Sequence, residues 1–175
     1  VNRVDEPHRL EVEYPGDVPQ TLGISLVESN AAGRVAPLGL DSGIEVGEPL
    51  PGSEPGWQRQ RIVFWPRTRT PLVVLVNRSD TSPAVFGRLA VQAGPARLSP
   101  PPNVPPPGRN DSRLAAALLD RPVFPENFGA GQAFDSDADG VWDDWLTFYQ
   151  GGVRLVEYLK YAGYNSAVIA VACEG

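Results

Sequence analysis

Hydrophobic and polar residues alternate in short runs over the first part of the chain. In "RLEVEY", Leu10 and Val12 would face one side of a strand, while Glu11 and Glu13 would face the other. Similar short runs follow, separated by glycine- and proline-rich turns: "TLGISLVE", "GIEVG", "QRIVFW", "PLVVLVN" and "AVFGRLAVQAG". Strands at this spacing are typical of an antiparallel β-sandwich or jelly roll, and we assign residues 1–97 to it.

The same alternation predicts which side chains form the core of the sandwich. They are Leu10, Val12, Ile24, Leu26, Ile62, Phe64, Val74 and Leu89. His8, beside Pro7 at the start of the first strand, is expected at the surface. The arginines of "RTRT", Arg67 and Arg69, would either meet acidic sugars or keep an edge strand soluble, and solubility is the simpler reading.

After the sandwich the pattern changes. "LSPPPNVPPPG", residues 98–108, contains six prolines and predicts a stiff, extended linker. Within residues 109–175, "NDSRLAAALLDRP" favours a short connector helix, and "DDWLTFYQGGVRLVEYLKYAG" a longer helix that stops at Gly163. The apolar run "SAVIAVA", residues 166–172, is typical of a parallel strand buried on both faces. One helix and one such strand would be the opening of a larger α/β unit.

Composition limits the classes of partner. Of the 175 residues 42% are hydrophobic, enough for a real core, and the net charge is -6. The arginines are scattered along the sequence, so neither nucleic acid nor an anionic membrane is expected as a partner, and no apolar run is long enough to span a membrane. There is no methionine, which we interpret as an excerpt from a longer reading frame whose leader is missing.

Four stretches together suggest a family: "PHRLEVEYPGDVPQTLGISLVE", "APLGLDSGIEV", "RIVFWPRTRTPLVVLVNR" and "TFYQGGVRLVEYLKYAGYNSAVIAVACEG". They resemble large secreted bacterial proteins in which a jelly-roll sandwich precedes a glycoside-hydrolase-like (β/α)8 barrel. The resemblance implies a carbohydrate-binding sandwich, a proline-rich linker and the start of a barrel whose catalytic groups mostly lie beyond residue 175. It also implies a secreted or cell-envelope location and a polysaccharide or glycan as the ligand.

The loop "DSDADGVWDD" needs its own explanation, because five carboxylates lie within ten positions. Calcium prefers several oxygen ligands, and carboxylates at positions 1, 3 and 5 followed by glycine at 6 can supply them around a tight turn. The candidate ligands are Asp135, Asp137, Asp139, the carbonyl of Val141, and Asp143. Position 12 is Leu146 where an EF-hand loop has glutamate, so Glu126 or Asp144 would have to complete the shell. The alternative is a solvated acidic turn with Asp143 and Asp144 at a helix N-terminus.

Candidate residues for sugar chemistry are few. Trp57 and Trp65 could stack on the apolar faces of sugar rings, or they could be packing residues of the sandwich. Glu174 follows the predicted parallel strand, where (β/α)8 enzymes gather their catalytic groups, and its alternative is a solvent-exposed strand end.

Two functions therefore compete. The first is a non-catalytic binding sandwich and barrel start of a secreted carbohydrate-active protein, catalytic only when the barrel is complete. The second is an adhesion or scaffold module without enzymatic activity, stiffened by calcium at the aspartate loop. Acidic pairs at the ends of later barrel strands would favour the first, and further sandwiches or repeats the second.

Overall fold

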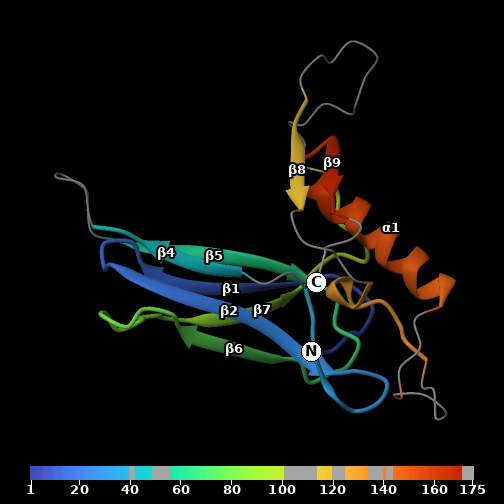
Figure 1. Cartoon of the computed structure of the whole chain (residues 1–175), viewed down its shortest axis with the longest axis horizontal. Coiled ribbons are helices and arrows are strands. Elements are labelled where there is room, and N and C mark those ends of the chain that lie inside the picture. The colour runs from blue at the N-terminus through green and yellow to red at the C-terminus, as the bar shows by residue number, and fades with distance from the viewer. Residues whose placement is uncertain are drawn as a thin grey trace.

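The chain forms two stacked antiparallel sheets and, at one end of them, a smaller element with parallel strands (Figure 1). A computed structural model describes residues 1–39, 42–48, 56–100, 114–119, 125–133, 140 and 144–170. The prediction of a mainly β fold with antiparallel sheets is confirmed.

The first sheet has the strand order β5–β1–β7. Its strands are β1 (His8–Pro15), β5 (Trp57–Phe64) and β7 (Leu89–Ala93), and β1 pairs with both neighbours in antiparallel register. Leu10 lies opposite Ile62 on one side and Val91 on the other, which places the apolar positions of the three strands on one face. The charged positions of β1 consequently share the opposite face.

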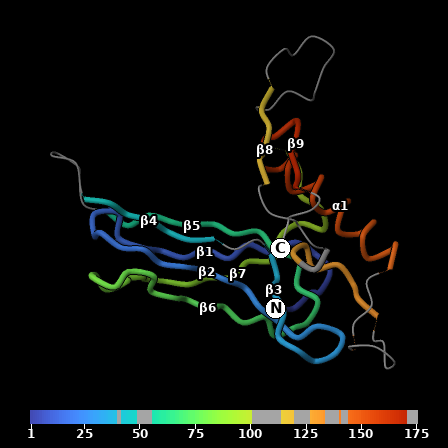
Figure 2. The backbone as a smooth tube through the Cα atoms, viewed as in Figure 1, coloured from blue at the N-terminus to red at the C-terminus, as the bar shows by residue number. Residues whose placement is uncertain are grey.

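The second sheet is built around β2 (Gln20–Ser29). One edge of β2 pairs with β6 (Leu72–Asn77), and the strand also pairs with β3 (Val35–Pro37) and β4 (Ser42–Val46), all antiparallel. The backbone tube in Figure 2 shows the long strands of both sheets running along the same axis. This arrangement is that of a β-sandwich.

The core lies between the sheets. Six of the eight predicted core residues are buried: Leu10, Val12, Ile24, Leu26, Ile62 and Phe64. The other two predictions are wrong, since Val74 and Leu89 are each 38% exposed. Val74 pairs with Ser25 while its neighbours Val73 and Leu75 point inward. The run "PLVVLVN" has no alternation from which that direction could be read. Leu89 belongs to β7, a strand with one paired edge among the described residues.

A buried ion pair joins the end of β2 to the segment after β5. The Glu28 carboxylate accepts hydrogen bonds from the backbone N–H (2.7 Å) and Nε (3.1 Å) of Arg67, and from the backbone N–H and Oγ1 of Thr68 (3.0 Å each). Its side chain has no exposed surface, and that of Arg67 is 9% exposed. The expected solubilising role is therefore wrong for Arg67, whereas Arg69 is exposed. The expectation that His8 lies at the surface is wrong as well, because His8 is 3% exposed and its ring lies beside that of Phe64.

The second part of the chain contains two parallel strands. β8 (Ala116–Leu119) pairs with β9 (Ser166–Ile169). Two hydrogen bonds join the residues that precede these strands: the backbone N–H of Asn165 donates to the carbonyl of Ala115, and the backbone N–H of Ala115 donates to Asn165 Oδ1. The predicted connector helix is thus wrong over residues 116–119. Alanine and leucine are among the strongest helix formers, but these preferences amount to less than about 1 kcal/mol per residue, and pairing with β9 overrides them.

The long predicted helix is confirmed as α1 (Trp145–Tyr161). Asp144 is its N-cap, with Oδ1 accepting from the backbone N–H of Thr147 at 3.0 Å. At the other end Gly163 has φ 85°, a left-handed conformation that suits glycine, and the next N–H bonds back to the Leu159 carbonyl. Both ends therefore follow from local sequence signals.

Helix α1 docks on the 3-10 turn η1 (Pro125–Phe128) through a buried arginine. Arg154 is 6% exposed and donates to the carbonyls of Phe128 (2.9 Å) and Gly129 (2.6 Å), and to the Asp5 carboxylate (3.2 Å). Burial lowers the pKa of Arg154, and the hydrogen bond and charge of Asp5 partly offset this effect. This contact ties α1 to the first residues of the sandwich.

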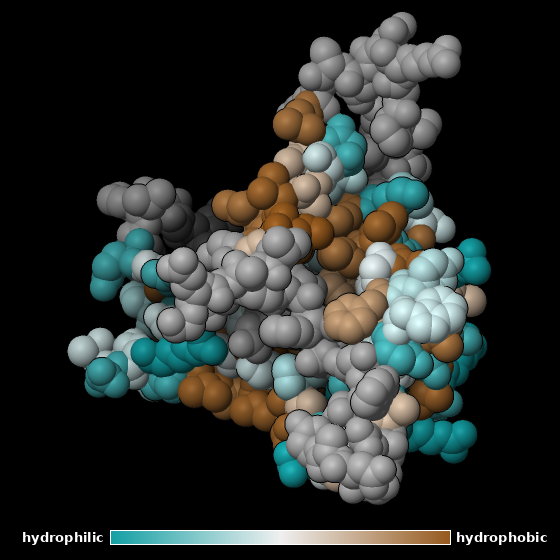
Figure 3. Space-filling view, turned by 45° about the vertical axis from the view of Figure 1, so that its right-hand side comes forward, coloured by the Kyte–Doolittle hydropathy of each residue, from teal (hydrophilic) through white to brown (hydrophobic). Residues whose placement is uncertain are grey.

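Most apolar side chains of the α/β element remain exposed. They include Leu118 (73%), Val168 (58%), Phe148 (58%) and Val153 (49%). Figure 3 shows hydrophobic surface gathered over this part of the molecule. The predicted parallel pairing of β9 is present, but the strand is not buried on both faces by the described residues.

Candidate functional site

The outer surface of the β5–β1–β7 sheet is covered by polar side chains. Arg59 of β5 lies opposite Glu13 of β1, and Arg61 lies opposite Glu11, so cations and anions alternate across the strands. Arg9 faces Gln92 of β7 in the same way. We call this surface the charged face, and its members are Arg9, Glu11, Glu13, Arg59, Arg61, Arg88 and Gln92.

Ion pairs orient these side chains. Arg59 Nε contacts Glu13 Oε1 at 3.1 Å, and Arg61 Nε contacts Glu11 Oε1 at the same distance. Arg9 Nη2 contacts Glu11 Oε1 at 3.1 Å and donates to Gln92 Oε1 at 2.6 Å. The side chains of Arg59 and Arg61 are each 56% exposed, and pairs this open stabilise a fold by about 0–1 kcal/mol. Their main effect is to hold the guanidinium groups in position.

The charge of this face is opposite to that of the whole chain. Four arginines and two glutamates leave an excess of two positive charges, whereas the full sequence carries -6. Strand alternation concentrates arginines that look scattered in the sequence, because "RQR" places both of its arginines on one side of β5. The local excess is small and is interrupted by the two glutamates, so the expectation that neither nucleic acid nor an anionic membrane is a partner stays a prediction.

A β-bulge lies at one end of the charged face. The backbone carbonyl of Glu13 accepts a hydrogen bond from the N–H of Gly87 (2.7 Å), and its backbone N–H donates to the carbonyl of Arg88 (3.0 Å). Two consecutive residues, Gly87 and Arg88, therefore lie opposite the single residue Glu13. A Cβ on Gly87 would lie 2.7 Å from Cζ3 of Trp57. The indole therefore packs directly on the glycine, where a larger residue would displace it.

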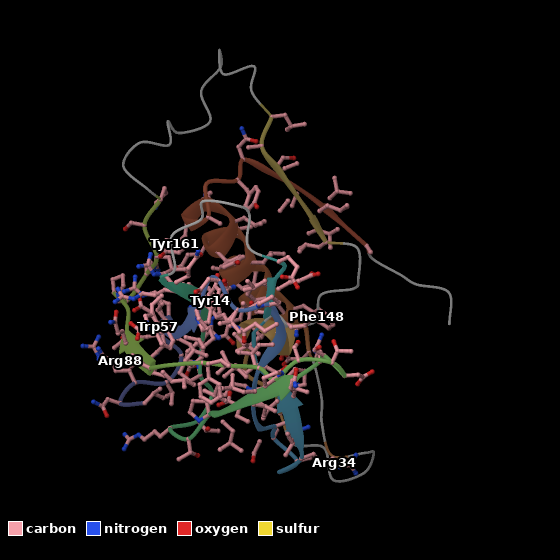
Figure 4. The ribbon with its side chains drawn as sticks, turned by 90° about the vertical axis from the view of Figure 1, so that its left-hand side faces the viewer. Tyr14, Arg34, Trp57, Arg88, Phe148 and Tyr161 are labelled. Atoms are coloured by element: carbon pink, nitrogen blue, oxygen red, sulfur yellow. The ribbon has the colours of Figure 1, made fainter. Side chains whose placement is uncertain are left out.

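Trp57 presents most of its ring to solvent. It is 63% exposed at the first position of β5, and Figure 4 shows it at the same side of the sandwich as Arg88. Of the two tryptophans predicted as stacking platforms, only this one has an accessible ring.

Trp65 is a packing residue, so its prediction as a stacking platform is corrected. It is 2% exposed, and its ring lies 6.1 Å from that of Phe128. Its carbonyl oxygen would be 1.9 Å from a Cβ at Gly129, whose φ is 63°. Trp65 thus helps to form the surface on which α1 docks.

Two adjoining hollows extend the charged face away from Trp57. The smaller, of about 130 Å³, is lined by Glu11, Glu13, Arg59, Arg88, Ala90 and Gln92. The second, of about 340 Å³, shares Gln92 and reaches Arg9 and Tyr161 of α1. From Glu13 to Arg9 the strip runs about 13 Å along β1, given a rise of about 3.3 Å per residue. It is long enough for an extended ligand.

The predicted calcium ligands Asp135, Asp137, Asp139, Val141 and Asp143 lie outside the described residues, as does Glu174. Two residues of the aspartate loop, Gly140 and Asp144, are described. Gly140 has φ 96°, as the tight turn of a calcium loop requires. Asp144 is the N-cap of α1, as the acidic-turn reading predicts. Among the described residues no group of three or more histidine, cysteine or acidic side chains could hold a metal ion.

Sequence reasoning missed the arginines of the charged face. A signal was present: "EVE" at 11–13 and "WQRQR" at 57–61 have matching period-2 patterns, with acids on one strand and bases on the other. Which strands become neighbours is not evident from either stretch alone, and Arg88 joins the face through a bulge that no local pattern predicts.

Comparison of the chain with protein-family models, with curated proteins and with solved structures gave no match. No helix in the described part of the chain is both long and apolar enough to cross a membrane.

Proposed function

We propose that the chain is a glycan-binding, jelly-roll-type sandwich joined to the start of a (β/α)8 barrel, from a secreted, glycoside-hydrolase-like protein. The observation that carries the proposal is the exposed Trp57, which packs on Gly87 at the end of the charged face. The resemblance in the sequence supports the same conclusion. In this proposal the sandwich binds a polysaccharide and has no catalytic role.

The chemistry of the face suits a sugar chain. An indole ring packs well against the apolar C–H face of a pyranose, and planar guanidinium, carboxylate and amide groups offer paired hydrogen bonds to hydroxyl groups. The ion pairs between β1 and β5 hold these side chains before a ligand arrives. Less side-chain entropy is then lost on binding, which favours affinity.

The α/β element supports the barrel part of the proposal. β8 and β9 are parallel, and α1 lies between them in the sequence, as in a βαβ unit. Parallel sheets occur almost only with both faces covered, and here Leu118 and Val168 are exposed. We propose that further strands and helices of the barrel cover these side chains.

Glu174 belongs to this proposal as a candidate for the substrate cleft beyond β9. If it contacts the reacting sugar, Glu174→Gln in a protein with the complete barrel should lower turnover or affinity about tenfold, which corresponds to roughly 1.4 kcal/mol. Unchanged kinetics with an intact fold would remove it from the cleft.

Replacement of Trp57 tests the binding proposal. Trp57→Ala should weaken binding at least about tenfold to any polysaccharide that retards the unaltered chain in a gel. The reason is that tryptophan side chains that become buried on binding are frequent hot spots in interfaces. Trp145→Ala is the matched control, since Trp145 is 73% exposed on α1, outside the charged face. Affinity electrophoresis against a panel of soluble polysaccharides measures both variants. Equal retention of the two variants and the unaltered chain would contradict the proposal.

A second function has one observation in its favour. The left-handed φ of Gly140 suits a calcium loop and therefore a calcium-stabilised adhesion or scaffold module without enzymatic activity. In that case the aspartates would bind calcium and stiffen the chain ahead of α1. Calcium titration distinguishes this function from a solvated acidic turn.

A further inference from the structure

We infer that the ligand of the charged face is an acidic polysaccharide, one that carries carboxylate or sulfate groups. This inference rests on the proposed glycan-binding function and adds the class of glycan. Three properties of the arginines of the charged face support it: their number, their spacing, and the N–H groups that no described residue bonds. Their concentration on one face contrasts with the chain as a whole, which is acidic.

Two arginines present unused donor pairs. Arg59 and Arg61 each use Nε for a neighbouring carboxylate, and no other described residue accepts from the Nη groups of either. The two residues are two positions apart on one strand, so their backbones are separated by about 7 Å on the same face. A planar guanidinium end donates two parallel hydrogen bonds to two oxygens of a carboxylate or sulfate, in a fixed geometry that an ammonium group does not provide.

Arg88 adds a third cation. Its side chain is exposed and makes no ion pair or hydrogen bond to the rest of the described chain. The backbone carbonyl of Arg88 accepts a hydrogen bond from Glu13, and Glu13 pairs on its other edge with Arg59. Arg59 and Arg88 therefore flank the same β1 residue, one on each side. Both arginines line the 130 Å³ hollow. The hollow therefore has cations on two sides, and one of its lining residues, Glu13, is bonded to Gly87, on which the Trp57 ring packs.

The carboxylates of the face do not reverse this charge. Glu11 and Glu13 are 12% and 25% exposed and each contacts at least one guanidinium, whereas the arginines above them are 56% exposed. An arriving polymer meets the cationic ends first. Charge complementarity over such an open surface favours association and is weakened by salt.

A nucleic acid fits this surface less well. A strand of phosphates needs a continuous positive track, and here paired carboxylates interrupt the arginines on a chain of net charge -6. A sugar polymer with spaced acidic groups instead matches separated cations and one aromatic platform. Nucleic acid is therefore an alternative outcome of the test.

The test uses two matched pairs of polymers with the 175-residue chain. Polygalacturonate is compared with its fully methyl-esterified form, and dextran sulfate with dextran, so that each pair differs only in charged groups. Affinity is measured by isothermal titration at low and high sodium chloride. We expect at least one acidic polymer to bind about tenfold more tightly than its neutral partner, and salt to weaken that binding.

Variants separate the inference from general attraction to polyanions. Arg59→Gln with Arg88→Gln should lower affinity for the acidic polymer about tenfold, while Arg34→Gln, an exposed arginine on the turn between β2 and β3, should leave it within twofold. An equal loss in the Arg34 variant would overturn the inference. So would an equally tight complex with a single-stranded oligonucleotide, which would indicate unspecific polyanion binding.

The outcomes also distinguish this inference from the function on which it rests. If neutral and acidic partners bind equally and Trp57→Ala abolishes both, the face binds glycans but the acidic class is wrong. If none of the four polymers binds, both the glycan-binding function and its acidic ligand are contradicted.

Discussion

Replacement of Glu28 by glutamine should destabilise the sandwich strongly. The carboxylate is fully buried and accepts four hydrogen bonds, two from Arg67 and two from Thr68. Glutamine preserves the volume of the side chain but replaces one oxygen by an N–H donor. That donor would face at least one group that itself donates, and the guanidinium of Arg67 would lose its counter-charge.

The size of the effect follows from this burial. Removing one partner of a buried ion pair costs about 3–5 kcal/mol, because the remaining charge stays away from water without compensation. For a chain of this length each kcal/mol corresponds to about 2–4 °C in Tm, so the Tm should fall by roughly 6–20 °C.

Urea unfolding followed by circular dichroism measures the change, with Glu13→Gln as the matched control. Glu13 makes the same kind of pair with Arg59, but on the surface, where such pairs contribute about 0–1 kcal/mol. We expect a large decrease in the free energy of unfolding for Glu28→Gln alone. Similar small decreases in both variants would refute the reasoning that burial makes the Glu28 pair essential.

Three further predictions concern other parts of the chain. Burial raises the pKa of Tyr158 above its ordinary value of 10.0, so the folded state holds the phenol proton more tightly than the unfolded state does. The stability that this group contributes is present below pH 10 and is lost as the pH rises through the folded-state pKa. Tyr158→Phe should therefore show a shallower alkaline decrease in the free energy of unfolding. Gly87→Ala should displace the Trp57 ring and weaken glycan binding as Trp57→Ala does, with little change in Tm; undiminished binding would show that the contact is unimportant. If the aspartate loop binds calcium, millimolar calcium should raise the Tm, and Asp137→Ala or Asp139→Ala should abolish this rise, whereas no heat of binding and no shift would leave a solvated turn.

The sequence predicted features that depend on local pattern. The alternation of "RLEVEY" correctly placed Leu10 and Val12 in the core, and the glycine after the long helix correctly marked its end. Such features follow from strand periodicity and from the freedom of glycine to adopt positive φ.

Features that depend on distant partners were not predicted. Ala116–Leu119 has a helix-forming composition, yet it is a strand because β9 supplies its hydrogen-bonding partners. Those partners lie 50 residues away in the sequence, since Ala116 pairs with Ser166. The burial of Arg67 likewise depends on Glu28, a residue on another strand. The charged face could be anticipated only in part, since the sequence showed Trp57 but not which strands would surround it.

The central claim is that a glycan binds on the outer surface of the β5–β1–β7 sheet. The most direct test is a titration of the isotopically labelled chain with fragments of the bound polysaccharide, followed by amide and indole N–H chemical shifts. We predict that the largest changes fall on the indole N–H of Trp57 and on the backbone around Arg59, Arg61 and Arg88. Changes confined to β6 or to α1, with Trp57 unaffected, would contradict the assignment of the charged face as the binding site.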